Sequence, residues 1–177
     1  MKMVLILALL ATLMSCGDGI KLCGDEKFSM SREENNTNKL RLDGYYYHSN
    51  NIGKEWAEVC LFYQNGIYTS LYSFDLSEIL DDDNKIVIPT LSKEWKSGWG
   101  IYKIQNNIIE IEQWMPRQCG GVSVVYNRGN IINDSTFNLN YYKTIQGGKV
   151  KEEGSLNLTF KFKPHSTKPD SIVSFIP

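Results

Sequence analysis

The first residue with distinctive chemistry is Cys16, which directly follows the run Leu13-Met14-Ser15. One basic residue, Lys2, stands ahead of an apolar stretch over residues 4–13. A stretch of about ten residues is too short to cross a membrane as a helix, which needs roughly 20, and it has the layout of a secretory signal. We therefore expect residues 1–15 to be a signal peptide and Cys16 to begin the exported chain.

The residues around Cys16 resemble the lipobox of Gram-negative lipoproteins, with Leu13 three positions ahead of the cysteine and the small Ser15 just before it. The resemblance implies diacylation of Cys16 and attachment to the cell envelope, because two acyl chains anchor a protein stably. In such lipoproteins an acid directly after the cysteine marks retention in the inner membrane. The acid here, Asp18, stands one place further on, which favours the outer membrane. An ordinary signal peptide with an incidental cysteine is the alternative.

Three further cysteines, Cys23, Cys60 and Cys119, would meet an oxidising compartment after export. We expect a disulfide between Cys60 and Cys119, which would close a loop of about 60 residues and stabilise the fold by roughly 4 kcal/mol. Cys23 could instead pair with either of them or stay free. Because three cysteines cannot all pair within one chain, a bridge to another molecule is a further alternative.

Other residue types that support catalysis or metal binding are poorly placed for it. The sequence has two histidines, His48 and His165, and their spacing indicates neither a catalytic pair nor a set of metal ligands. Glu110 and Glu112 alternate on one predicted strand and would share a face, where solvated glutamates are far commoner than a catalytic pair. The run Asp81-Asp82-Asp83-Asn84 lacks the glycine and glutamate of a calcium loop. We therefore expect no enzyme, no cofactor and no metal site.

Aromatic residues offer a different chemistry, the stacking of a ligand on exposed rings. Tyr45 and Tyr47 would lie on one face of a strand, and Trp99 and Trp114 lie on later predicted strands. These four residues are the candidate ligand-binding set, for an apolar molecule or a sugar. Aromatic-rich strands more often serve only as core and rim packing, which is the competing interpretation.

The elements that must position these residues are predicted to be strands. Apolar and polar residues alternate along 156–163 and 137–141, a pattern typical of half-buried antiparallel strands. Asn65-Gly66 and Asn106-Asn107 each separate two such runs and predict tight hairpins. Arg128-Gly129 and Gly147-Gly148 are read as further chain reversals. The predicted strands are 40–48, 56–64, 67–74, 85–89, 99–105, 108–115, 122–127, 130–133, 135–143 and 154–163.

Composition divides the chain into parts. Residues 16–39 are polar and are expected to form a flexible tether behind the lipid. Residues 40–163 form one β domain, with about one turn of helix expected near residues 75–83. The tail, 164–177, carries two prolines and the apolar run Ile172-Val173-Ser174-Phe175-Ile176, so an edge strand and a free tail are both open.

Four strings stand out within residues 40–143: Leu40-Arg41-Leu42-Asp43-Gly44-Tyr45-Tyr46, Phe62-Tyr63-Gln64-Asn65-Gly66, Trp99-Gly100-Ile101-Tyr102-Lys103-Ile104 and Ile131-Ile132-Asn133-Asp134-Ser135-Thr136-Phe137. They resemble uncharacterised Gram-negative lipoproteins with a lipocalin-like meander. The resemblance implies an all-β fold, an antiparallel up-and-down meander closed into a lipocalin-like (calycin-type) barrel. Closure is favourable because it removes exposed sheet edges, and an eight-stranded barrel is either filled by side chains or holds one small ligand.

Two hypotheses for function follow from these patterns. The first is a lipid-anchored, non-enzymatic module that binds a small apolar or carbohydrate ligand. The alternative is a structural or protein-interaction lipoprotein, an accessory subunit or inhibitor with an envelope protein partner and no ligand. Nucleic acid is not expected as a partner, because the chain has a net charge of −1 at pH 7 and shows no basic stripe.

Overall fold

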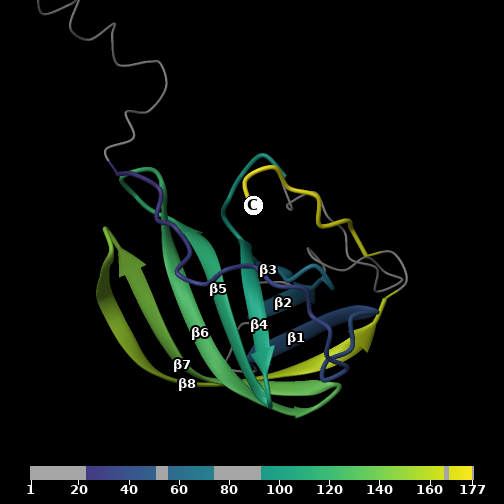
Figure 1. The fold of residues 1–177 in the computed structure, drawn as a ribbon. Helices are drawn as coiled ribbons and strands as arrows, with labels where there is room; N and C mark the ends of the chain where they lie inside the picture. Colours follow the sequence, from purple (N-terminus) through teal and green to yellow (C-terminus); the bar gives the residue numbers. More distant parts are fainter. Residues whose placement is uncertain (1–22, 51–55, 74–92, 166–167, 177) are drawn as a thin grey trace, which may run out of the picture.

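The computed structural model describes residues 23–50, 56–73, 93–165 and 168–176. These residues form eight antiparallel strands in a closed up-and-down barrel, which follow one another around it in chain order (Figure 1). The strands are β1 (Gly44–Asn50), β2 (Trp56–Phe62), β3 (Ile67–Ser73), β4 (Trp99–Gln105), β5 (Ile108–Pro116), β6 (Val122–Asn133), β7 (Thr136–Gln146) and β8 (Lys149–Pro164). The predicted all-β meander and its closure into a lipocalin-like barrel are confirmed.

Closure comes from the pairing of the first strand with the last. Gly44 pairs with Pro164 and Tyr47 with Lys161, so that every strand has a neighbour on both sides. Gly44 is required at this seam, because a Cβ there would collide with the Lys163 carbonyl oxygen and the Phe162 ring. Among the described residues, no helix is long and apolar enough to span a membrane.

Turn chemistry explains most of the strand boundaries. Gly66 and Asn106 adopt positive φ angles of 79° and 57° in the β2–β3 and β4–β5 hairpins. Gly147 and Gly148 do the same between β7 and β8, with φ of 60° and 68°. These three predicted reversals are confirmed. Strands β1 to β5, β7 and β8 match predicted strands apart from their ends, whereas the predicted strands 122–127 and 130–133 form the single strand β6. The predicted strand 85–89 and the helical turn near 75–83 lie outside the described residues.

The predicted reversal at Arg128-Gly129 is wrong. Both residues lie inside the continuous strand β6, at a register shift against β7. Gly129 is there because the neighbouring backbone comes close, and a Cβ would collide with the Asn138 carbonyl oxygen. Glycine inside a strand marks such a close approach or a bulge as readily as it marks a turn.

Each strand sends alternate side chains to opposite faces of the sheet, and apolar side chains gather on both faces. The first group we call the lumen cluster. It comprises Leu40, Tyr46, Cys60, Phe62, Tyr68, Tyr102, Ile109, Ile111, Ile131, Phe137, Leu139 and Phe160. Its rings touch across strands that are not neighbours: the centroids of Phe62 on β2 and Phe137 on β7 are 5.6 Å apart. Such contacts are possible only on the concave side, so this cluster fills the barrel interior.

The second group, the outer-face cluster, lies on the convex side. It comprises Tyr45, Val59, Leu61, Tyr63, Ile67, Leu71, Trp99, Ile101, Trp114, Val122, Val124, Val173 and Ile176. A convex apolar face needs a cover, and the two chain ends supply part of it. Phe28 and Met30 of the N-terminal segment (residues 23–39) and Phe175 of the C-terminal segment (residues 168–176) pack against it.

The N-terminal segment is therefore part of the folded domain, which corrects the predicted tether over residues 23–39. A disulfide joins Cys23 to Cys119 in the β5–β6 loop, with the two Cα atoms 5.6 Å apart. The polar composition suggested disorder, but a few well-placed apolar side chains and this covalent link hold the segment. Residues 1–22, with the expected signal peptide and Cys16, lie outside the described residues.

The expected disulfide between Cys60 and Cys119 is also wrong. Cys60 is a free thiol buried in the barrel lumen, whereas Cys119 lies in a loop at one end of the barrel.

The C-terminal segment is neither an edge strand nor a free tail, the two alternatives that the sequence left open. Residues 168–176 form no strand, yet Val173 and Ile176 are buried in the outer-face cluster. Lys168 Nζ donates hydrogen bonds to the carbonyl oxygens of Leu42 and Phe62.

Removal of the disulfide by Cys119→Ser should lower the free energy of unfolding by about 2 to 5 kcal/mol, because the bridge restrains a long loop of the unfolded chain. Chemical denaturation measures this loss, and Cys60→Ser serves as the free-thiol comparison. Peptide mapping without reduction should recover Cys23 linked to Cys119. A peptide that links Cys60 to Cys119 would contradict the assignment.

Candidate functional site

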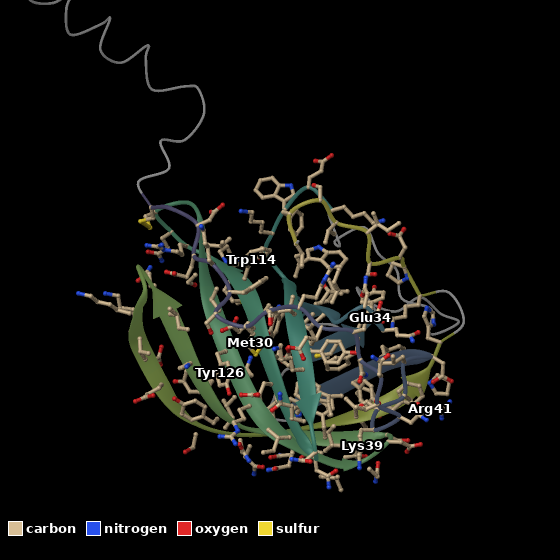
Figure 2. All side chains as sticks on the ribbon, in the orientation of Figure 1. Met30, Glu34, Lys39, Arg41, Trp114 and Tyr126 are labelled. Carbon is tan, nitrogen blue, oxygen red and sulfur yellow. A yellow bond between two sulfur atoms is a disulfide. The ribbon has the colours of Figure 1, made fainter. Side chains whose placement is uncertain are left out.

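A cleft of about 790 Å³ lies over β4 and β5. The N-terminal segment, the outer face of the sheet and the C-terminal segment all contribute to its lining. Its apolar lining consists of Phe28, Met30, Ile101, Trp114, Phe175 and Ile176. Asp25, Glu26, Lys27, Ser31, Arg32 and Lys96 complete the boundary. In Figure 2 the labelled Trp114 and Met30 are seen over the same part of the barrel.

Glu112 fixes the wall that the N-terminal segment provides. Its side chain points to the outer face of β5 and is fully buried. One carboxylate oxygen accepts hydrogen bonds from the backbone N–H groups of Ser29, at 2.7 Å, and Met30, at 2.9 Å, and the other accepts from the Ser29 hydroxyl. Hydrogen bonds to a carboxylate are stronger than neutral ones, so this side chain locks the segment in place beside the cleft.

Trp114 forms the centre of the cleft floor. Phe28 stacks on its ring with centroids 4.0 Å apart, and Phe175 approaches edge-on at 5.8 Å. Its indole N–H donates to the Glu26 carbonyl oxygen at 2.8 Å. The ammonium group of Lys96 lies 5.3 Å from the ring and forms a salt bridge of 2.7 Å with Asp25. The ring of Trp114 is thus already engaged by protein groups, which leaves little of its face for a sugar.

The four predicted ligand-binding aromatics all belong to or pack against the outer-face cluster, and Tyr45 and Tyr47 share a face as predicted. Only Trp114 lines the cleft. Tyr45 and Trp99 are 1% exposed and serve as core packing. Tyr47 is half-buried beside Tyr45, with ring centroids 6.4 Å apart.

Sequence reasoning missed the residues that form the walls of the cleft. Phe28 and Met30 stand two positions apart and would lie on one face of an extended segment. They were missed because the stretch around them is polar in overall composition. Phe175 and Ile176 belong to the apolar run that was noted, but its position over β4 and β5 depends on the closed barrel. Ile101 lies on a strand that was predicted, but the sequence pattern gave no sign of a cleft over that strand.

The other candidate groups have structural partners. Glu110 accepts a hydrogen bond of 2.5 Å from the Tyr126 hydroxyl on the outer face. A ring nitrogen of His48 lies 2.9 Å from the Thr159 carbonyl oxygen, and the His165 ring packs 5.9 Å from the Tyr45 ring. Within the part of the chain that the structure describes, no group of three or more His, Cys, Asp or Glu side chains is placed to hold a metal ion.

A second polar group lies inside the barrel. Cys60 Sγ is 3.1 Å from the Tyr68 hydroxyl and 3.7 Å from Glu58 Oε1, and the Tyr68 hydroxyl lies 3.4 Å from the same oxygen. Burial raises the pKa of Glu58 to about 7, although hydrogen bonds from Tyr72 and Cys60 act in the opposite direction. Burial also raises the pKa of the Cys60 thiol, so the nucleophilic thiolate is disfavoured at neutral pH.

Comparison with known proteins gives no match: no protein-family model, no curated protein and no solved structure resembles this chain. The cleft and the lumen group therefore have to be interpreted from their own geometry.

Glu58 predicts a specific dependence of stability on pH. Its pKa of about 7 in the fold lies above the ordinary value of 4.5, so the folded state binds more protons between these values. The free energy of unfolding should therefore fall as pH rises from about 5 to about 8, by roughly 2 to 3 kcal/mol at most from this group. Denaturant unfolding of the wild type and of Glu58→Gln across this range measures the difference. Parallel pH profiles of the two proteins would contradict the assignment.

Proposed function

We propose that this protein is a lipid-anchored, non-enzymatic binding protein of the cell envelope that holds a small apolar ligand in the cleft over β4 and β5. The observation that carries the proposal is the cleft itself, at about 790 Å³ and lined by six apolar side chains from both chain ends and two strands. Pockets for small molecules typically measure about 300 to 1,000 Å³ and combine an apolar lining with a few polar groups.

The cleft is favoured over the lumen as the ligand site. Tyr46, Phe62, Tyr102, Phe137 and Phe160 are each at most 1% exposed and occupy the interior near the end of the barrel where Leu40 is buried. The stacked rings of Phe137 and Phe160 have centroids 4.7 Å apart. A ligand there would have to displace this packed aromatic layer.

An apolar ligand is favoured over a carbohydrate by the state of Trp114. Sugars bind to aromatic side chains through a free ring face, and this ring carries Phe28 on it and Lys96 above it. The thioether of Met30 and the aliphatic side chains of Ile101 and Ile176 instead offer an adaptable apolar surface. Acidic and basic side chains at the boundary of the cleft keep its opening hydrated.

A charge placed in the cleft should abolish most of this binding. Titration with the neutral fluorescent probe N-phenyl-1-naphthylamine should show saturable binding to the wild type. Met30→Glu should weaken it on the order of 10-fold or more, because an unpaired charge would be buried with the ligand. Ile172→Glu is the matched control, since Ile172 is 79% exposed on the C-terminal segment and does not line the cleft. An equal loss of probe affinity in both variants, or the absence of saturable probe binding to the wild type, would refute the cleft as the ligand site.

The anchor is tested independently through Cys16. Protein expressed with its own leader in a Gram-negative host should sediment with the envelope and show a diacylated N-terminal Cys16 by mass spectrometry. The Cys16→Ala variant should be found in the soluble fraction, since the hydrophobic contribution of the acyl chains is about 0.8 kcal/mol per buried CH₂. An unmodified wild-type protein that is soluble would refute the anchor and leave the cleft proposal standing.

A further inference from the structure

The disulfide shortens the connection between Cys16 and the folded domain. Six residues separate Cys16 from Cys23, and Cys23 is bonded to the β5–β6 loop. Even fully extended, a connection of this length spans at most roughly 25 Å. A tether that ended at residue 39 would have held the barrel much more loosely.

The connection attaches at one end of the barrel. The Cys23–Cys119 disulfide lies beside the β7–β8 hairpin, because Cys23, Arg117, Gln146 and Lys151 line the same surface hollow. The backbone N–H of Gly148 also donates to the Glu26 carboxylate at 3.1 Å. Figure 1 shows the start of the described chain, in purple, beside the β5–β6 loop. The turn between β6 and β7, at Asp134-Ser135, lies at the opposite end of those strands.

The β7–β8 hairpin has the composition of a membrane-contacting tip. Val150 is 51% exposed, and the exposed Lys149 and Lys151 flank it directly after the two open glycines of the turn. The two acids that follow are held by hydrogen bonds from tyrosines, Glu152 by Tyr142 at 2.7 Å and Glu153 by Tyr141 at 2.5 Å. An apolar side chain between lysines can enter the headgroup layer while the ammonium groups meet lipid phosphates.

We propose that the barrel sits on the membrane with its β5–β6 loop and β7–β8 hairpin toward the lipid, and with Val150 in contact with the phospholipid headgroups. This inference rests on the proposed acylation of Cys16. The proposed orientation also places the cleft close to the membrane. The cleft lining begins at Asp25, two residues after the disulfide, so an apolar ligand would reach it from a site close to the bilayer surface.

Site-specific fluorescence on the acylated protein tests this orientation. Val150→Cys places a reactive thiol at the β7–β8 end of the barrel, and Ile132→Cys places one at the opposite end. Each variant has a single reactive thiol, because native Cys60 is buried and Cys23 and Cys119 are paired. Ile132 is 62% exposed, near the β6–β7 turn, and is the matched control. Each variant is labelled with nitrobenzoxadiazole and reconstituted into phosphatidylethanolamine–phosphatidylglycerol vesicles that contain a headgroup nitroxide lipid.

The label at position 150 should be quenched roughly two-fold more strongly than the label at position 132, since only the first reaches the headgroup layer. Equal quenching of the two labels on acylated protein, or stronger quenching at position 132, would overturn the orientation and leave the anchor intact. Mass spectrometry of the same preparation separates the two proposals. A chain without acyl groups on Cys16 would overturn the anchor and the orientation together.

Discussion

Strands β2 to β4 are buried on both faces over most of their length, and this burial governs how the rest of the chain packs. From Ala57 to Phe62 every side chain of β2 is buried, on the concave and the convex side alike. A strand buried on both faces reads as a continuous apolar run, whereas a half-buried strand alternates. Closure into a barrel covers only the concave face. The convex face therefore requires separate cover, and the chain ends provide part of it.

That requirement accounts for the architecture of the candidate site. The contacts that hold the N-terminal segment include the Cys23–Cys119 disulfide, the Phe28–Trp114 stack and the hydrogen bonds to Glu112. The C-terminal segment is held by Val173 and Ile176 in the outer-face cluster. Both covers line the cleft, together with Ile101 of β4 and Trp114 of β5. The proposed ligand site is thus a consequence of covering an apolar convex face with two separate segments.

The barrel lumen contains both aromatic and polar side chains. Aromatic rings fill the interior near Leu40, and Glu58, Cys60 and Tyr68 form a polar group next to them on β2 and β3. Because Glu58 is buried, its neutral form is favoured and its pKa rises to about 7. The buried carboxyl therefore links the stability of the barrel to pH near neutrality, separately from any binding in the outer cleft.

The order of strands, their hairpins and the sharing of faces could be predicted from local patterns, because alternation and turn residues act between neighbours in the chain. Tyr45 and Tyr47 were correctly assigned to one face, but which face was core could not be read, since both faces are buried in this region. Likewise Gly129 resembled a turn glycine, although it marks a close approach between β6 and β7.

Short stretches of residues were enough to predict the all-β meander, which the structure confirms, and to propose Cys16 as an acylation site. Only the tertiary structure decided the partner of Cys119, the folding of residues 23–39 onto the barrel and the position of the cleft. Those features join residues 80 to 100 positions apart. Barrel closure brings Cys23 to the β5–β6 loop and turns Cys60 into the lumen, and no local pattern distinguishes these two thiols before the barrel has closed.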